Sequence, residues 1–268
     1  INGSRPVFNA YDDEVWLRDP YLHRVTHNGK TKFHLIHTWG WDHPALFHWE
    51  SDDLIHWTAA NGGTRTDDGK IMLMDGHDGG PVSPNAWAPE FTYDGQTGTF
   101  YLYWSSRIGD RQVHHYCTTK DWLTFSTPAV YFDPGFTAID MTILKEGDTY
   151  YAYYKDERNG EKTIRCATSK SLDPRVQRFE GSTPLLPSRY IEVEGPEVFP
   201  AIGGKGWFLY FDKFNGDRGV SYTGCTDPSQ HKWYPIPDDE IRNPTEVKHG
   251  SVEIISTAEL EKLLEHFK

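Results

Sequence analysis

Short runs of apolar and aromatic residues, separated by polar turn residues, occupy most of the chain and predict β-strands. Gly-containing pairs such as Asp94-Gly95 and Asn159-Gly160 fall between successive runs, as hairpins require. Helical spacing occurs at Thr257–Leu264, which predicts one short terminal helix. The expected strands are Lys32–Thr38, Ala45–Glu50, Thr99–Ser105, Val113–Thr118, Thr149–Lys155, Thr163–Thr168, Gly206–Asp212 and Gly219–Gly224.

A weak internal repeat organises these runs. The stretch from Ser51 to Trp57 recurs from Thr119 to Phe125, with looser echoes beginning at Ser169 and Thr226. The successive spacings of 68, 50 and 57 residues suit four-stranded propeller blades with variable loops. The N-terminal segment and Lys248–Ser256 are left over, and we expect them to pair as a fifth blade. The prediction is an all-β, five-bladed propeller with a short C-terminal helix, forming one catalytic domain over residues 1–268.

Composition narrows the function classes. Aromatic residues make up 15% of the 268 residues, which favours strands and offers stacking surfaces for ligands. The net charge of −12 argues against nucleic-acid binding, which needs clustered positive charge. No apolar run approaches the roughly 20 residues of a membrane span, so we expect no membrane partner. No signal peptide is present in the sequence, which leaves the compartment open, with an extracellular or periplasmic location favoured.

The three cysteines fall in similar repeat contexts, so we expect buried free thiols in separate blades. These are Cys117, Cys166 and Cys225.

Three acidic residues stand among apolar ones ahead of a hairpin, and each is a candidate for chemistry. They are Asp19, Asp140 and Glu194. A single Asp-Pro or Glu-Gly-Pro is ordinary turn chemistry. Three such acids at equivalent points of three blades would converge on one funnel, where buried like charges are costly unless they serve a task. We therefore interpret them as a catalytic set.

The ordered motifs resemble family 43 of the glycoside hydrolases over essentially the whole chain. They are Arg18-Asp19-Pro20, Trp87-Ala88-Pro89-Glu90, Ile139-Asp140, Glu194-Gly195-Pro196 and Lys248-His249-Gly250-Ser251-Val252. The resemblance implies a five-bladed propeller and an inverting glycosidase that acts on plant cell-wall side chains.

By the same resemblance, Asp19 is the general base that activates water, Glu194 is the general acid, and Asp140 tunes and holds that acid. Such an acid needs a raised pKa, which burial beside a second carboxylate provides. Two departures stand out. Glu197 flanks the acid motif and is an alternative acid, and Met141 follows Asp140 where the family pattern leads us to expect proline.

Further residues are candidates for substrate binding. Trp39, Trp41 and His43 lie in one loop, and Trp87 lies at the head of the second blade, where indole rings could stack on a sugar or pack between blades. Arg158 could contact hydroxyl groups. Lys155 and Asp212 end predicted strands and are weaker candidates.

The thirteen histidines form no familiar metal-binding motif, so we expect no catalytic metal and no required cofactor. His249 is the exception, because it begins the predicted closing strand that faces the central channel. It is a candidate substrate contact and a possible indirect, water-mediated contact to a structural calcium ion.

The leading expectation is an exo-acting, monomeric enzyme that removes a terminal α-L-arabinofuranose from an oligosaccharide or polysaccharide. The loops around Trp39–Pro44 and Gly62–Pro84 are long enough to wall off a pocket. A β-xylosidase, β-galactosidase or galactofuranosidase of the same family is the enzymatic alternative. A carbohydrate-binding propeller without catalysis is the alternative from another class, and a protein-interaction propeller is poorly supported.

Overall fold

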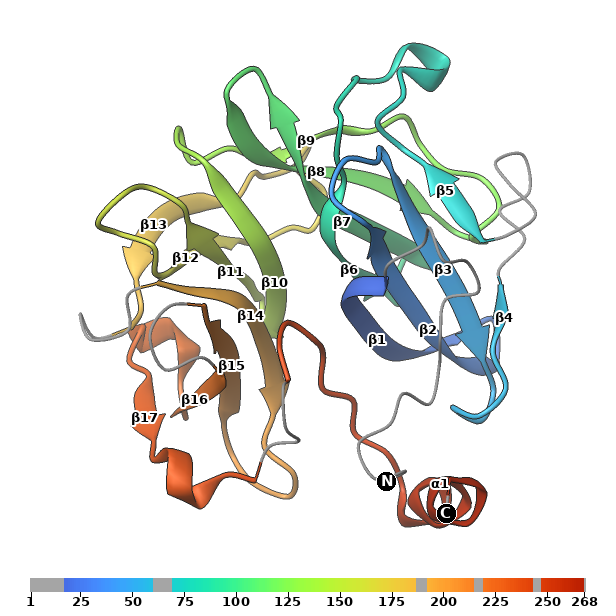
Figure 1. Cartoon of the computed structure of the whole chain (residues 1–268), viewed down its shortest axis with the longest axis vertical. Helices are drawn as coiled ribbons and strands as arrows, with labels where there is room; N and C mark the ends of the chain where they lie inside the picture. Colours follow the sequence, from blue (N-terminus) through green and yellow to red (C-terminus); the bar gives the residue numbers. More distant parts are fainter. Residues whose placement is uncertain (1–16, 60–68, 187–191, 215–218, 243–246, 268) are drawn as a thin grey trace.

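Four antiparallel β-sheets stand side by side like blades, each built from consecutive strands of the chain (Figure 1). The computed structural model describes residues 17–59, 69–186, 192–214, 219–242 and 247–267. The first blade contains β1 (Leu17–His27), β2 (Lys30–Trp39), β3 (Ala45–Ser51), β4 (Thr58–Ala59) and β5 (Lys70–Met72), and the second contains β6 (Trp87–Asp94), β7 (Thr99–Ile108), β8 (Arg111–Thr119) and β9 (Ala129–Phe132). The third blade contains β10 (Ala138–Glu146), β11 (Thr149–Asp156), β12 (Ile164–Ser169) and β13 (Glu180–Pro184). The fourth contains β14 (Val193–Pro200), β15 (Trp207–Lys213), β16 (Gly219–Cys225) and β17 (Tyr234–Ile236). Among these described residues, short 3₁₀ turns cover His77–Gly79, Pro228–Gln230 and Asp238–Glu240, and α1 covers Thr257–His266.

The internal repeat marks one recurring turn, between the third and fourth strands of a blade. After β3, the hydroxyl of Ser51 accepts the backbone N–H of Leu54, and after β8 Thr119 accepts that of Trp122. Leu54 and Trp122 both adopt left-handed backbone conformations, with φ of 65° and 59°. Hydroxyl and carboxylate side chains stabilise such turns by taking up local N–H groups, which explains why the repeat is rich in Ser, Thr and Asp.

The hydrophobic core lies mainly between neighbouring blades. Trp104 belongs to the cluster between the first and second blades, Tyr154 to the next and Phe211 to the one between the third and fourth. The three cysteines are buried free thiols in β8, β12 and β16, the third strands of three different blades, as predicted.

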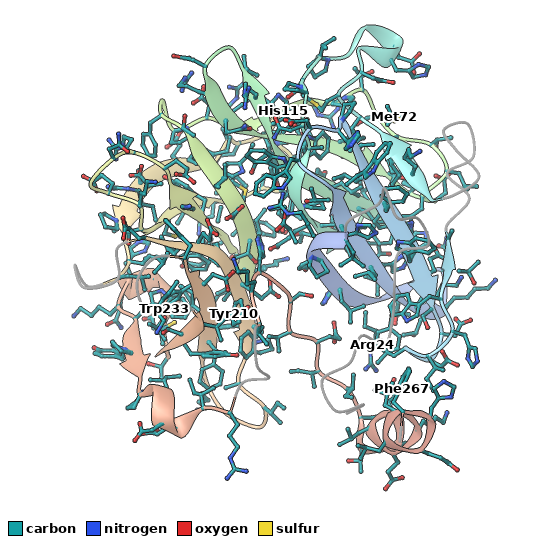
Figure 2. All side chains as sticks on the ribbon, viewed as in Figure 1. Arg24, Met72, His115, Tyr210, Trp233 and Phe267 are labelled. Atoms are coloured by element: carbon teal, nitrogen blue, oxygen red, sulfur yellow. The ribbon has the colours of Figure 1, made fainter. Side chains whose placement is uncertain are left out.

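The expected fifth blade is wrong for the part of the chain that the structure describes. Residues 247–256 contain no strand and run as an irregular segment between the first and fourth blades (Figure 1). Its contacts there use individual side chains: the Tyr210 hydroxyl donates to the Lys248 carbonyl, and Leu22 N donates to the Ser251 hydroxyl. Figure 2 labels Tyr210 beside this segment. The N-terminal part of that expectation, residues 1–16, lies outside the described residues.

The terminal helix is confirmed, with Ser256 and Glu259 forming a capping box at its start. Its residue Leu263 packs with Phe33 and Leu54 of the first blade. Among the described residues, no helix has the length and apolar character to cross a membrane.

Candidate active site

The same backbone irregularity recurs in the innermost strand of all four blades. In each, the register with the second strand shifts across two residues, and one residue at the shift takes a positive φ. These residues are Asp19 (48°), Ala88 (46°), Asp140 (54°) and Gly195 (56°). Asp19 and Asp140 are therefore equivalent, whereas Glu194 stands one residue before the equivalent point. The expectation that all three acids are equivalent needs this correction of one position.

A second recurring position joins each bulge to the next blade. Opposite the residue before each bulge, the second strand carries Thr38, Ser105, Lys155 or Asp212. Thr38 Oγ1 accepts Ala88 N at 2.9 Å, Ser105 Oγ accepts Asp140 N at 3.2 Å, Lys155 Nζ donates to Glu194 Oε2 at 2.7 Å, and Asp212 Oδ2 accepts His249 N at 2.6 Å.

His249 N thus receives from the fourth blade the kind of contact that the Ala88 and Asp140 bulges receive from the blades before them. The irregular C-terminal segment takes the place of a fifth inner strand without forming one.

A cavity of about 560 Å³ opens over these bulges, a size suited to a small ligand. It contains the three predicted catalytic acids together with two further acids, Glu157 and Asp212. The lining residues are Leu17, Arg18, Asp19, Pro20, Trp41, Trp87, Ile139, Asp140, Glu157, Glu194, Asp212, Lys248 and His249.

Asp19 has defined partners for both of its carboxylate oxygens. Thr38 Oγ1 donates to Oδ2 at 2.9 Å, and Nδ1 of His249 lies 3.5 Å from Oδ1. The side chain keeps 13% of its surface exposed, so the carboxylate is held in place and still reaches the cavity.

Asp140 and Asp212 are buried more deeply. Burial raises the pKa of Asp140 to about 6, with Glu194 and Asp19 adding to the rise while His249 and Lys155 oppose it. Burial likewise raises the pKa of Asp212 to about 7. Asp140 Oδ2 accepts the N–H of Gly195 at 3.0 Å and so fixes the backbone next to Glu194.

His249 lies at the centre of this acidic group. Burial lowers its pKa, but the carboxylates of Asp140, Asp19, Asp212 and Glu194 outweigh burial and leave the pKa raised. Calcium prefers oxygen ligands, so the carboxylates of this group suit a calcium ion better than a direct bond to the His249 imidazole does. The water-mediated calcium contact stays a prediction.

The predicted substrate-binding residues divide into two groups. Trp41 and Trp87 line the cavity: Trp41 is 53% exposed, the Arg18 guanidinium lies 3.5 Å from its ring centroid, and Trp87 Nε1 donates to its carbonyl. The rings of Trp39 and His43 stack on each other at 3.9 Å, and neither residue lines the cavity.

Arg158 also lies outside the lining, because its guanidinium pairs with buried Asp156 at 2.7 Å and covers Phe136 at 3.9 Å. The structure thus places Arg158 outside this cavity lining, and its contact with a substrate hydroxyl stays a prediction. Of the segment 62–84, residues 69–84 are described, and none of them lines the cavity.

Sequence reasoning missed Glu157 and gave too little weight to Lys155 and Asp212. The sequence did hold a signal: Ser105, Lys155 and Asp212 are polar residues that each end a predicted strand at the same repeated position. In the structure all three are buried and pair with the residue before a bulge.

The alternative acid, Glu197, occupies a different level of the central channel. It is 4% exposed and lines a second cavity of about 370 Å³, not the first. Burial raises its pKa to about 8 and holds the pKa of its neighbour Glu90 well above the usual range. Their other hydrogen-bond partners are neutral: Thr142 Oγ1 and Val252 N reach Glu197 at 3.4 and 3.5 Å, and Tyr103 Oη reaches Glu90 at 3.2 Å. The charge of His249 opposes the rise in the pKa of Glu197.

One group with metal-ligand spacing occurs among the described residues, away from this cavity lining. Ligand atoms of His34, His48 and Glu50 lie within 4.8 Å of one another. However, His34 Nδ1 and His48 Nε2 already hydrogen-bond to each other at 3.0 Å, and the Lys32 ammonium pairs with Glu50. These contacts already engage one ring nitrogen of each histidine and the Glu50 carboxylate, whereas His48 Nδ1 is buried without a hydrogen-bond partner among the described residues.

Comparisons with known proteins agree with the motifs and the fold. Residues 1–261 match the family model Glyco_hydro_43_rel, described as "Probable glycosyl hydrolase domain". An α-L-arabinofuranosidase of Bifidobacterium longum subsp. longum is 27% identical over 244 residues, which cover 74% of this chain and 22% of that protein. The chain thus spans about a fifth of the length of this curated relative.

Solved structures share the fold at low sequence identity. A thermostable family-43 glycoside hydrolase matches with a TM-score of 0.61 and 21% identity, over 85% of this chain and 73% of that one. Bacteroides ovatus Xyloglucan PUL GH43B matches with a TM-score of 0.64 and 18% identity, over 90% of this chain and 43% of that one. The α-L-arabinofuranosidase PaAbf62A from Podospora anserina, solved with cellotriose, matches with a TM-score of 0.59 and 12% identity, over 93% of this chain and 76% of that one. With its motifs, its propeller fold and the family match in agreement, the chain belongs to the glycosyl hydrolase domains related to family 43.

Proposed function

We propose that this domain is an inverting, exo-acting glycosidase whose terminal sugar is α-L-arabinofuranose. The observation that carries the proposal is that Asp19 and Glu194 line one cavity from the first and fourth blades, and that the His249 ring reaches Asp19, with Nδ1 3.5 Å from Oδ1. That ring packs so tightly on Gly195 that an added Cβ would lie 2.9 Å from it. Inverting enzymes hold their two carboxyl groups roughly 6.5–9.5 Å apart so that a water molecule fits, and an imidazole that reaches Asp19 and packs on Gly195 suits such a separation.

In this proposal the reaction is a single displacement. The Asp19 carboxylate takes a proton from water while the water oxygen attacks the anomeric carbon. The glycosidic C–O bond breaks, its electron pair stays on the leaving oxygen, and Glu194 gives that oxygen its proton. Asp140 supports this step through its hydrogen bond to Gly195 N, beside the acid.

The choice of sugar rests on weaker support. The curated relative is named an α-L-arabinofuranosidase, but structural relatives include an arabinanase from Bacillus subtilis and an exo-β-1,3-galactanase from Phanerochaete chrysosporium. A cavity of this size, with the exposed Trp41 ring at its edge, suits one terminal sugar stacked on an aromatic surface.

The test is the release of nitrophenol from p-nitrophenyl α-L-arabinofuranoside, with the β-xyloside and β-galactoside measured in parallel. We expect turnover of the arabinofuranoside, and NMR of the first product should show an inverted anomeric configuration. Faster turnover of another glycoside would assign a different terminal sugar to the enzyme, and a product with retained anomeric configuration would overturn the inverting mechanism. Binding of arabino-oligosaccharides without any hydrolysis would favour the carbohydrate-binding alternative.

A further inference from the structure

The position that joins each bulge to the next blade has one exception. In the first, second and fourth blades it is a hydrogen-bond acceptor, which takes the backbone N–H of the following bulge or, after the fourth blade, of His249. In the third blade it is Lys155, whose ammonium can only donate. The N–H of Gly195 is accepted instead by Asp140.

The Lys155 ammonium instead pairs with two carboxylates. Nζ lies 2.7 Å from Glu194 Oε2 and 2.7 Å from Glu157 Oε1, and the Phe214 ring centroid lies 4.1 Å away. The side chain is 2% exposed. Burying an ammonium is costly even when it is paired, so a lysine at a position that a small hydroxyl residue fills in two sister blades indicates a task.

We propose that Lys155 is a positioning residue that directs the Glu194 carboxyl into the cavity and stabilises the carboxylate that forms when Glu194 gives up its proton. The inference rests on the proposed function, because it takes Glu194 as the general acid. Negative charge develops on Glu194 as the proton passes to the leaving oxygen, and an ammonium at hydrogen-bond distance stabilises that charge. The benefit is largest for a leaving group that needs full protonation. Glu157 shares the ammonium and moderates its effect.

Three variants test this assignment through the pH dependence of kcat/KM. Activity at high pH requires a protonated Glu194, and the Lys155 charge favours the ionised form. Lys155→Met should therefore move the basic limb up by about one pH unit, whereas Glu157→Gln should move it down. Lys155→Arg, which keeps the cation, should leave the limb near its wild-type position.

A second readout uses two leaving groups. Lys155→Met should lose about tenfold more activity on an unactivated arabino-oligosaccharide than on the nitrophenyl glycoside. The matched control is Lys162→Met, because Lys162 Nζ lies 3.8 Å from Glu157 in the same corner. This control should change neither the limb nor the leaving-group ratio.

An unchanged basic limb in both Lys155→Met and Glu157→Gln would overturn the role of Lys155 while leaving the proposed function intact. If Lys155→Met does not fold, the Glu157→Gln profile still decides, since a merely structural lysine predicts no movement of its basic limb. Failure of the proposed function itself would appear earlier, as absence of turnover by the wild-type protein.

Discussion

The central channel carries acidic residues at two levels, and their surroundings differ. At the upper level, Asp19 and Glu194 line an open cavity and have cationic partners in His249 and Lys155. At the lower level, Glu90 and Glu197 are fully buried against each other and against neutral hydroxyl and N–H groups. Burial raises the pKa of Glu197 to about 8, with His249 opposing the rise, and holds the pKa of Glu90 well above its usual range, so this buried pair retains a proton.

This difference separates acids suited to chemistry from acids suited to structure. Glu194 and Glu197 are only three residues apart, yet the bulge between them sends one to each level. The following predictions test that division.

The largest effect is expected at the upper level from Asp19→Ala. Removing the proposed base should lower kcat/KM by about 10³-fold. The variant should fold, because the equivalent bulge of the second blade already carries alanine, Ala88, at nearly the same φ. Steady-state kinetics with thermal unfolding as the control checks both statements, and a fully active Asp19→Ala protein would remove Asp19 from the mechanism.

A smaller effect, which depends on the substrate, should distinguish the two glutamates. Glu194→Gln should lower turnover of an unactivated oligosaccharide by about 10²-fold and that of an activated aryl glycoside far less. Glu197→Gln should stay within a few-fold of the wild type on both. The measurement is kcat/KM for each variant on each substrate; a larger loss in Glu197→Gln would reverse the two roles.

The smallest effect concerns stability at the lower level. Folded Glu197 keeps a proton up to about pH 8 that the unfolded chain releases above its ordinary pKa of 4.5, so the free energy of unfolding falls as pH rises between these values. Glu197→Gln removes that dependence. Its Tm relative to the wild type should therefore be higher at pH 8 than at pH 5, by about 3 °C.

Thermal unfolding of both proteins at the two pH values measures this difference. Glu265→Gln, at an exposed position of α1, is the control and should show no such change. Equal differences at both pH values would mean that Glu197 does not hold its proton.

Much of the fold was predictable because it is local. Alternating apolar residues between Gly-containing turns define β2, β7, β11 and β15 to within a few residues, and the Ser51 and Thr119 repeats mark the blades. The sequence could not reveal that the described part of the chain forms no fifth blade, because Lys248–Ser256 has the apolar content of a strand. Its backbone is instead held by single contacts such as those of Tyr210 and Ser251, which no periodicity reveals.

The candidate site was predictable in its acids but not in its partners. Asp19, Asp140 and Glu194 stand out as acids in apolar surroundings, and they do line one cavity. Glu194 lies one residue before the position equivalent to Asp19 and Asp140, because each inner strand has a bulge with a left-handed residue. The sequence does not predict these bulges, since Asp19 and Asp140 are not glycines. Lys155 meets Glu194 across 39 positions of the chain, a contact that only the packing of blades creates.

The segment of residues 247–256 makes the site depend on the order in which the parts of the fold assemble. His249 lies against four carboxylates from three blades, and together they raise the pKa of its imidazole. Until Asp212 captures His249 N and α1 docks on the first blade, these acids face one another without that imidazole. The appearance of glycosidase activity during refolding should therefore follow, and report, the arrival of the C-terminal segment rather than the formation of the sheets.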